Sequence, residues 1–207
     1  MPRPRRHDLE SVLDAVEDLT AGSGVAAVTT RALAAETGVS NGAIYHGFGS
    51  RAAVLGHAWL RAAHRFLDIQ RSQIAAVPTG SDPVESVVAA AEAPAVLAER
   101  HPGSAALLTA LERPVLIAAG VPTTLVGELA AVQDRLVEVL VELAERMWHR
   151  RDGVAVAVIT TCVVDLPTAI LLTRGRLSDA AARRQLRAAV RAVATVGPDD
   201  RPRKGPR

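Results

Sequence analysis

Four residues close together in the sequence have side chains that could contact a nucleic acid: Asn41, Ala43, Tyr45 and His46. Asparagine can hydrogen-bond the edge of adenine through two bonds, and an alanine methyl can meet the methyl group of thymine. Tyrosine and histidine can donate to phosphate or base edges. A core helix would carry leucine or valine at such positions. These residue types therefore predict a short helix that is exposed on one side and reads DNA.

The residues around this helix predict a helix-turn-helix unit. Thr29 can cap a first short helix, and Gly38 supplies the backbone freedom for the tight turn after it. Ser40 can cap the second helix, predicted over residues 41–46, by accepting an N–H bond of its first turn. Ser50 can cap a third. Two helices joined by a Gly-containing turn fit the major groove of DNA.

This stretch resembles the DNA-binding domain of the TetR (tetracycline repressor-like) family of transcriptional regulators. The resemblance fades after about Leu67, beyond which only the helical character and the length agree. Apolar residues at helical spacing predict a first helix over residues 8–21, with an acidic outer face that includes Glu17. This helix matches the first helix of the family, which braces the helix-turn-helix. The matching residues are Thr29, Leu33-Ala34, Gly38-Val39-Ser40, Gly42, Ile44-Tyr45, Phe48, Ser50-Arg51 and Leu55.

The sequence departs from the family pattern just after the predicted recognition helix. Gly47 stands where the family has histidine or tyrosine, so a DNA contact there is missing or made by His46. Arg51 replaces a lysine and would contact phosphate as a fork. Ala52 and Ala53 replace acidic residues, which removes a capping carboxylate and leaves the start of the next helix less firmly fixed.

From the residue types and the resemblance, Thr29, Tyr45 and Arg51 are predicted to contact phosphate, and Asn41, Ala43 and His46 to contact bases. The basic arm, residues 1–7, either reaches DNA or is a solvated tail. The full predicted DNA-binding set is Thr29, Arg31, Ser40, Asn41, Gly42, Ala43, Tyr45, His46 and Arg51.

Composition predicts an all-α protein. Hydrophobic residues make up 49% of the 207 residues and aromatic residues only 2%, so the core must be built mainly from Ala, Val and Leu, and little alternates as a strand would. The net charge of +2 argues against indiscriminate coating of nucleic acid. A single cysteine, Cys162, fits a reducing compartment, and no signal peptide is visible, so a cytoplasmic location is expected.

Helical patterns and breaks predict an N-terminal three-helix helix-turn-helix domain and a C-terminal helical domain for ligand binding and dimerisation. The clearest break is residues 78–83, PTGSDP. A break that ends a short helix is predicted at residues 112–114, and long helices are predicted after a Thr123 or Thr124 cap, over residues 154–173, and after a Ser178 cap. The predicted parts are residues 1–50 (DNA-binding domain, with the arm), 51–77 (connecting helix), 78–196 (ligand and dimerisation domain) and 197–207 (disordered tail).

The stretch 154–173 is apolar and long enough to cross a bilayer, but Asp165 and Pro167 lie inside it. An aspartate near the centre of a membrane helix costs about 3 kcal/mol. The alternative is a helix buried on both sides, against its own domain and a second subunit. The resemblance implies a homodimer through residues 154–173 and 178–196, which would hold two recognition helices about 34 Å apart on a palindrome.

The resemblance also implies a small-molecule effector bound among the middle helices. No catalytic residues, metal ligands or cofactor are predicted, because nucleophile, metal and phosphate-loop motifs are absent. Polar candidates for the effector site, each of which could equally be structural, are His101, Thr109, Glu112, Arg113, Gln133, Trp148, Thr160 and Asp165.

The sequence therefore predicts a regulator, a repressor by its resemblance, that binds double-stranded DNA and is released by a ligand. Two alternatives stay open. One is a helical ligand-binding bundle that has lost DNA binding, for which Gly47 and the low net charge are the hints. The other is a protein-interaction module that acts through the apolar residues 154–196.

Overall fold

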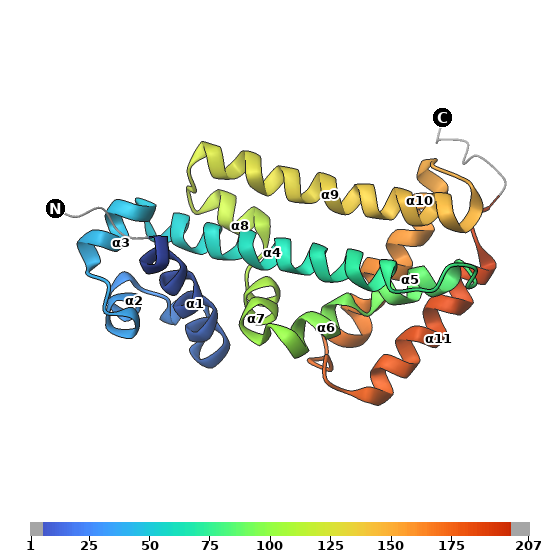
Figure 1. Cartoon of the computed structure of the whole chain (residues 1–207), viewed down its shortest axis with the longest axis horizontal. Helices are drawn as coiled ribbons and strands as arrows, with labels where there is room; N and C mark the ends of the chain where they lie inside the picture. The colour runs from blue at the N-terminus through green and yellow to red at the C-terminus, as the bar shows by residue number, and fades with distance from the viewer. Residues whose placement is uncertain (1–5, 200–207) are drawn as a thin grey trace. The chain divides into compact units, whose positions relative to one another are not determined.

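The computed structural model describes residues 6–199, and in that range every regular element is a helix (Figure 1). The predicted all-α fold is confirmed. The elements, including one 3-10 turn (η1) and two π-helical segments (η2, η3), are α1 (Arg6–Ser23), η1 (Val25–Ala27), α2 (Thr30–Thr37), α3 (Asn41–Phe48), α4 (Arg51–Ala75), α5 (Val84–Ala91), α6 (Ala93–Arg100), α7 (Pro102–Ala110), α8 (Arg113–Ala118), α9 (Thr123–Trp148), α10 (Gly153–Thr160), η2 (Thr161–Asp165), η3 (Thr168–Leu172) and α11 (Ala180–Val196).

The chain forms two compact units. The first contains the described residues of Met1–Arg65 together with Leu97–Gln133, and the second contains Phe66–Val96 with the described residues from Asp134 on. Both units thus combine segments far apart in the sequence. The functional division predicted from the sequence stays a prediction, and residues 1–5 of the arm and 200–207 of the tail lie outside the described residues.

The first unit has its core where α1 packs against α2, η1 and α7. Val12 and Val16 of α1 are fully buried, as are Leu33 of α2 and Ile44 of α3. These residues recur at helical spacing, so each short helix presents one apolar stripe to its neighbours. The packing of α1 against α2 and α3 holds the helix-turn-helix as one body.

The second unit is built around α5, α11 and the long apolar helix from α10 through η3. Its core is rich in alanine and valine, and Leu143, Ile159, Leu171 and Leu186 are its largest fully buried side chains. Small side chains let helix axes approach closely, which is how a chain with so few aromatic residues fills its interior. The core expected from composition is the one observed.

The apolar helix changes its winding at Pro167. Proline has no N–H to give to the carbonyl four residues earlier. On either side of it the backbone bonds skip five residues, from Leu166 N–H to Thr161 O and from Thr173 N–H to Thr168 O at 2.9 Å. These are π-helical turns of the kind that absorb such a defect.

Among the described residues, this helix, Gly153–Leu172, is the one long and apolar enough to cross a membrane, and 33% of its 18-residue apolar window is buried in the chain. Core helices of soluble proteins meet the same length and composition test. The side of this helix that was expected to pack against its own domain is buried, at Ile159, Cys162 and Leu171. Ala157, Asp165 and other residues on the remaining faces are uncovered in the single chain.

Helix boundaries differ from the sequence expectation at three places. A short helix, α8, begins at Arg113 in place of the expected break, because Pro114 suits a first helical turn, in which its missing N–H costs nothing. Helix α9 already includes Thr123, and its first amides bond to the carbonyl of Pro122. Helix α11 is capped by Asp179 and not by Ser178.

Candidate nucleic-acid interface

The two caps and the turn predicted for the helix-turn-helix are all present. The Thr29 hydroxyl accepts a bond from the Ala32 amide at 3.1 Å, and the Ser40 hydroxyl accepts one from the Ala43 amide at 3.2 Å. Gly38 lies between the helices with φ 72°, a left-handed conformation that favours glycine. These contacts fix where α3 starts relative to α2.

The recognition helix α3 is longer than predicted, because it runs through Gly47 to Phe48 and ends at Gly49 with φ 83°. Gly47 allows α1 to come close. A Cβ atom there would lie 2.6 Å from Cδ2 of Leu9. Where the family has histidine or tyrosine, this chain has a glycine whose backbone packs against Leu9 of α1.

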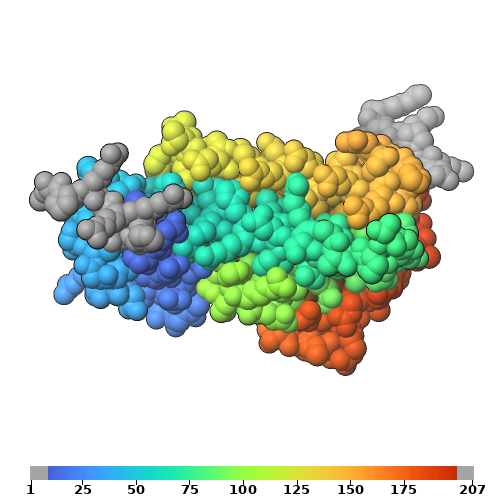
Figure 2. Space-filling view, in the orientation of Figure 1, coloured from blue at the N-terminus to red at the C-terminus, as the bar shows by residue number. Residues whose placement is uncertain are grey.

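Helix α3 buries one side and exposes the other. Ile44 is 1% exposed, whereas Tyr45 is 69% exposed, and Asn41 and His46 are exposed as well. Ala43 is half-buried, and Thr29 and Arg31 of the preceding helix region are exposed. Helices α2 and α3 lie at the surface of the molecule (Figure 2). The exposed face predicted for the helix is confirmed, while its contacts to DNA stay a prediction.

Arg51 has partners that the sequence did not reveal. Its Nε donates to the carbonyl of Val28, and its Nη2 donates to the carbonyl of Val25 at 2.7 Å. The Ser50 hydroxyl accepts a bond from the Ala53 amide at 3.1 Å. The start of α4 is therefore fixed by a serine cap and by Arg51, although the capping carboxylate is absent. The expectation of a loosely fixed helix start was wrong.

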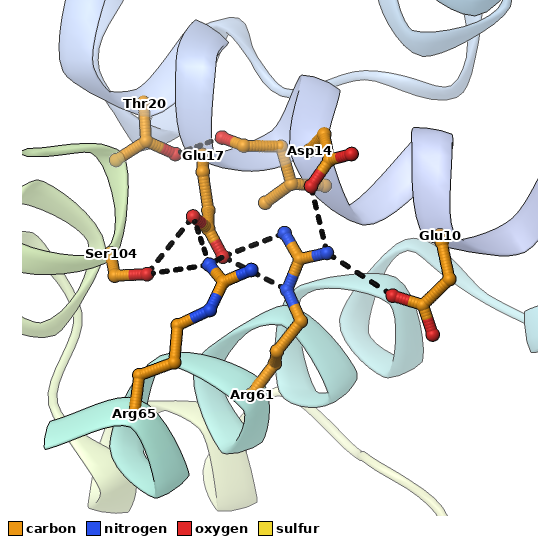
Figure 3. A network of polar contacts seen from close by, with 8 residues as sticks. Glu10, Asp14, Glu17, Thr20, Arg61, Arg65 and Ser104 are labelled. Carbon is orange, nitrogen blue, oxygen red and sulfur yellow. Dashed lines mark hydrogen bonds and ion pairs between the residues drawn. The ribbon is translucent and has the colours of Figure 1, made fainter. Parts of the chain in front are cut away.

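A buried carboxylate ties α1 to α4 and α7 (Figure 3). Glu17, whose side chain is 8% exposed, accepts bonds from Nη2 of Arg61 at 2.7 Å and from Nη1 of Arg65 at 2.9 Å. The Ser104 hydroxyl donates to it at 2.9 Å. Glu17 was expected on the outer acidic face, and this was wrong. Its arginine partners lie 44 and 48 residues away, so no local pattern could have revealed them.

The outer part of the same network is exposed. Arg61 also contacts Asp14 at 2.8 Å and Glu10 at 3.3 Å, and both carboxylates are more than half exposed. Burial alone would lower the pKa of Arg61, but hydrogen bonds and charge attraction from Glu17 and Asp14 outweigh it, so the pKa is raised. Arg61 therefore keeps its charge at every accessible pH.

Helix α7 approaches α1 closely at a glycine. A Cβ atom on Gly103 would lie 2.7 Å from Cβ of Glu17 and 3.1 Å from its carbonyl carbon.

A ring contact joins α3 to α4. The rings of Phe48 and His57 lie at a tilt to each other, with centroids 5.6 Å apart. The recognition helix is thus held to α4 at its end, and its brace α1 is held to both α4 and α7.

The polar residues proposed for an effector site do not form one described group. In the first unit, Thr109 donates to the carbonyl of Ala105 in its own helix at 2.8 Å. In the second unit, Thr160 does the same toward Val156 at 2.9 Å, and Asp165 is exposed. The other five candidates are His101, Glu112, Arg113, Gln133 and Trp148. None of the eight lines any of three surface grooves that lie within single units. Their role in ligand binding stays a prediction.

Among the described residues, no group of three or more His, Cys, Asp or Glu side chains is arranged to hold a metal ion. Cys162 is buried and free, and burial raises the pKa of its thiol to about 11. A thiol with so high a pKa remains protonated near pH 7 and behaves as a small apolar side chain.

Comparison with known proteins places the helix-turn-helix in a family. Residues 12–58, from α1 into α4, match the profile of the bacterial regulatory proteins of the tetR family. The resemblance stated from the sequence is confirmed over this stretch. None of the curated proteins matches the sequence.

Solved structures share the fold over most of the chain. The TetR-family transcriptional regulator PfmR from Thermus thermophilus is 19% identical, with a TM-score of 0.66 and coverage of 89% of this chain and 97% of that one. A TetR-like transcriptional regulator from Rhodococcus sp. RHA1 is 22% identical, with a TM-score of 0.64 and coverage of 92% and 98%. The superantigen PfiT is 15% identical, with a TM-score of 0.63 and coverage of 95% and 98%. At these identities the likeness extends to the fold alone.

Proposed function

We propose that this chain is a repressor that binds a palindromic operator as a homodimer and releases it when a small molecule binds, because residues 12–58 match the profile of the bacterial regulatory proteins of the tetR family. The observation that carries the proposal is α3, a capped helix that anchors Ile44 in the core and leaves Asn41, Tyr45 and His46 exposed. Packing within the chain does not account for the exposed tyrosine, whereas contact with DNA would.

We assign base reading to Asn41, Ala43 and His46 and phosphate contact to Tyr45 and Thr29. Arg31 is exposed on α2 and can add a phosphate contact. Two of the five N–H groups of Arg51 already donate to the carbonyls of Val25 and Val28, so any phosphate contact must use the three that remain, on Nη1 and Nη2. We expect the affinity for DNA to fall as salt rises, because each phosphate contact releases counterions.

Dimerisation is supported by the surface of the second unit. The helix from α10 through η3 is largely apolar, but only a third of its 18-residue apolar window is buried in the chain. On α11, Ala188 and Ala192 are exposed beside a buried face of Leu186 and Val190. Small exposed side chains on adjacent helices allow close approach of a second copy, and a dimer would place two recognition helices on one palindrome.

Release by a ligand requires only that the ligand prefer one conformer. A preference of a few kcal/mol is enough to shift the population from a DNA-competent to an incompetent spacing of the two recognition helices. Because DNA is its target, we expect the protein to act in the cytoplasm.

Selection from a random DNA pool by the full chain, at about physiological salt, tests the proposal. We expect an enriched palindrome. Asn41→Ala should lose discrimination by about 1–3 kcal/mol at one base pair of each half-site. Tyr45→Phe, which removes only an exposed hydroxyl, should weaken binding to all sequences alike. Enrichment of no sequence, or equal losses on every sequence for both variants, would contradict the assignment.

The exposed apolar helix also supports an alternative, a module that binds another protein through residues 154–196, since the fold occurs in a superantigen as well as in regulators. Sedimentation of the purified chain separates the two possibilities. A stable dimer supports the regulator, and a monomer that enriches no DNA supports the interaction module.

A further inference from the structure

A groove of about 530 Å³ lies within the first unit, between η1, the first turns of α4, and α8. Its volume is within the range of about 300–1,000 Å³ found for sites that take small organic ligands. One wall carries Arg51, and the others are largely apolar, contributed by Val25, Leu55, Leu111, Val115 and Leu116.

The apolar side of the groove includes a side chain that folding leaves uncovered. Val115 on α8 is 55% exposed, although Leu116 beside it is 1% exposed. Leu55, Leu111 and Leu116 are 8% exposed or less, so the apolar surface that a ligand could cover belongs mainly to Val115, and covering it is favourable. A ligand with an apolar body would therefore gain free energy by lying against α8.

The polar side of the groove is cationic. The partners of the Arg51 guanidinium are the carbonyls of Val25 and Val28, which are uncharged. Among the described residues, no carboxylate forms an ion pair with it, unlike Arg61 and Arg65. An anion would form charge-assisted hydrogen bonds with this group, which are stronger than those to neutral carbonyls.

We propose that this groove binds an anionic amphiphile, a molecule with an apolar body and one carboxylate or sulfonate, and that it is an effector site of the regulator. The effector role rests on the proposed function, whereas the binding does not. The apolar body lies against Val115 and Val25, and the anionic group takes hydrogen bonds from Arg51.

Binding at this place would act on the helix-turn-helix directly. The carbonyls of Val25 and Val28 that Arg51 holds belong to the turn just before Thr29, the cap of α2. Arg51 itself begins the helix that follows α3. An anion that draws the guanidinium away from these carbonyls releases the turn before α2 and so changes how α2 and α3 are held.

The binding is tested on the full chain with 8-anilinonaphthalene-1-sulfonate, which has aromatic rings, a sulfonate and a fluorescence that rises in apolar sites. Val115→Trp fills the groove, and Ile117→Trp is the matched control, because Ile117 is 41% exposed on the same helix but does not line the groove. We expect the dissociation constant of the probe to rise at least tenfold in Val115→Trp and to change less than twofold in Ile117→Trp. Equal affinity of the two variants for the probe would overturn the site.

The charge requirement is tested by competition at pH 7.5. Octanoate should displace the probe at a concentration at least tenfold lower than octan-1-ol, which has the same chain length without the charge. Equal displacement by both would overturn the anionic class. If an operator is found, octanoate should weaken binding of DNA by the Ile117→Trp variant and have at least tenfold less effect on the Val115→Trp variant. If the groove binds the probe but octanoate leaves the affinity for the operator unchanged, the effector role is overturned. If no operator is found, the proposed function is contradicted, but the evidence for a ligand site in the groove is unaffected.

Discussion

Replacing Glu17 by glutamine should destabilise the first unit strongly, because it removes a buried charge that faces two arginines. Removing one partner of a buried ion pair costs about 3–5 kcal/mol. Arg61 is 16% exposed and keeps Asp14 at 2.8 Å, and Arg65 is 31% exposed and can reach water. These remaining partners place the loss near the lower limit, at about 3 kcal/mol.

The assay is thermal unfolding followed by circular dichroism, at one fixed protein concentration because the melting temperature of an oligomer depends on it. For a chain of this size, about 3 kcal/mol corresponds to a drop of about 6–12 °C. Glu10→Gln is the control. Glu10 contacts Arg61 at 3.3 Å and is 56% exposed, so its loss should cost less than about 1 kcal/mol.

A double-mutant cycle isolates the interaction itself. Arg61→Met combined with Glu17→Gln should destabilise by about 1–3 kcal/mol less than the sum of the two single changes, because each removes the same contact. A melting temperature of Glu17→Gln no lower than that of Glu10→Gln, or additive effects in the cycle, would refute the reasoning that Glu17 is the central group of the network.

Two glycines and one helix cap yield further predictions. Gly103→Ala should destabilise the chain by about 1–3 kcal/mol, because the new Cβ would lie 2.7 Å from Cβ of Glu17. Gly127→Ala, whose Cβ would have no atom within 4 Å, should stabilise α9 by about 0.5–1 kcal/mol. Denaturant unfolding of both variants measures the two effects. A hydrogen bond from Arg176, followed by two backbone amides, lowers the pKa of Asp179, so the stability it contributes is present above about pH 4 and is lost as the pH falls through the lower folded value. Asp179→Asn should therefore show a shallower loss of melting temperature as the pH falls below about 4, and an unchanged acid profile would contradict this assignment.

The sequence by itself determined the helix-turn-helix, because the interactions that define it are local. The caps Thr29 and Ser40 bond amides three residues ahead, and Gly38 adopts its turn conformation through its own lack of a side chain. The residue types at positions 41, 43, 45 and 46 likewise indicated that α3 has an exposed side. Such signals lie within one or two turns of the chain and are visible in the order of residues.

Only the tertiary structure decided which of several plausible partners each side chain meets. Glu17 resembles its acidic neighbours in the sequence, yet it alone is buried between arginines more than forty residues away. Arg51 was predicted to face phosphate and is found on carbonyls 23 and 26 residues earlier. The proximity of Gly47 to Leu9 is of the same kind. Sequence pattern fixes the face of a helix, but the distance between two helices depends on how every side chain between them packs, and that is settled only when the chain is folded.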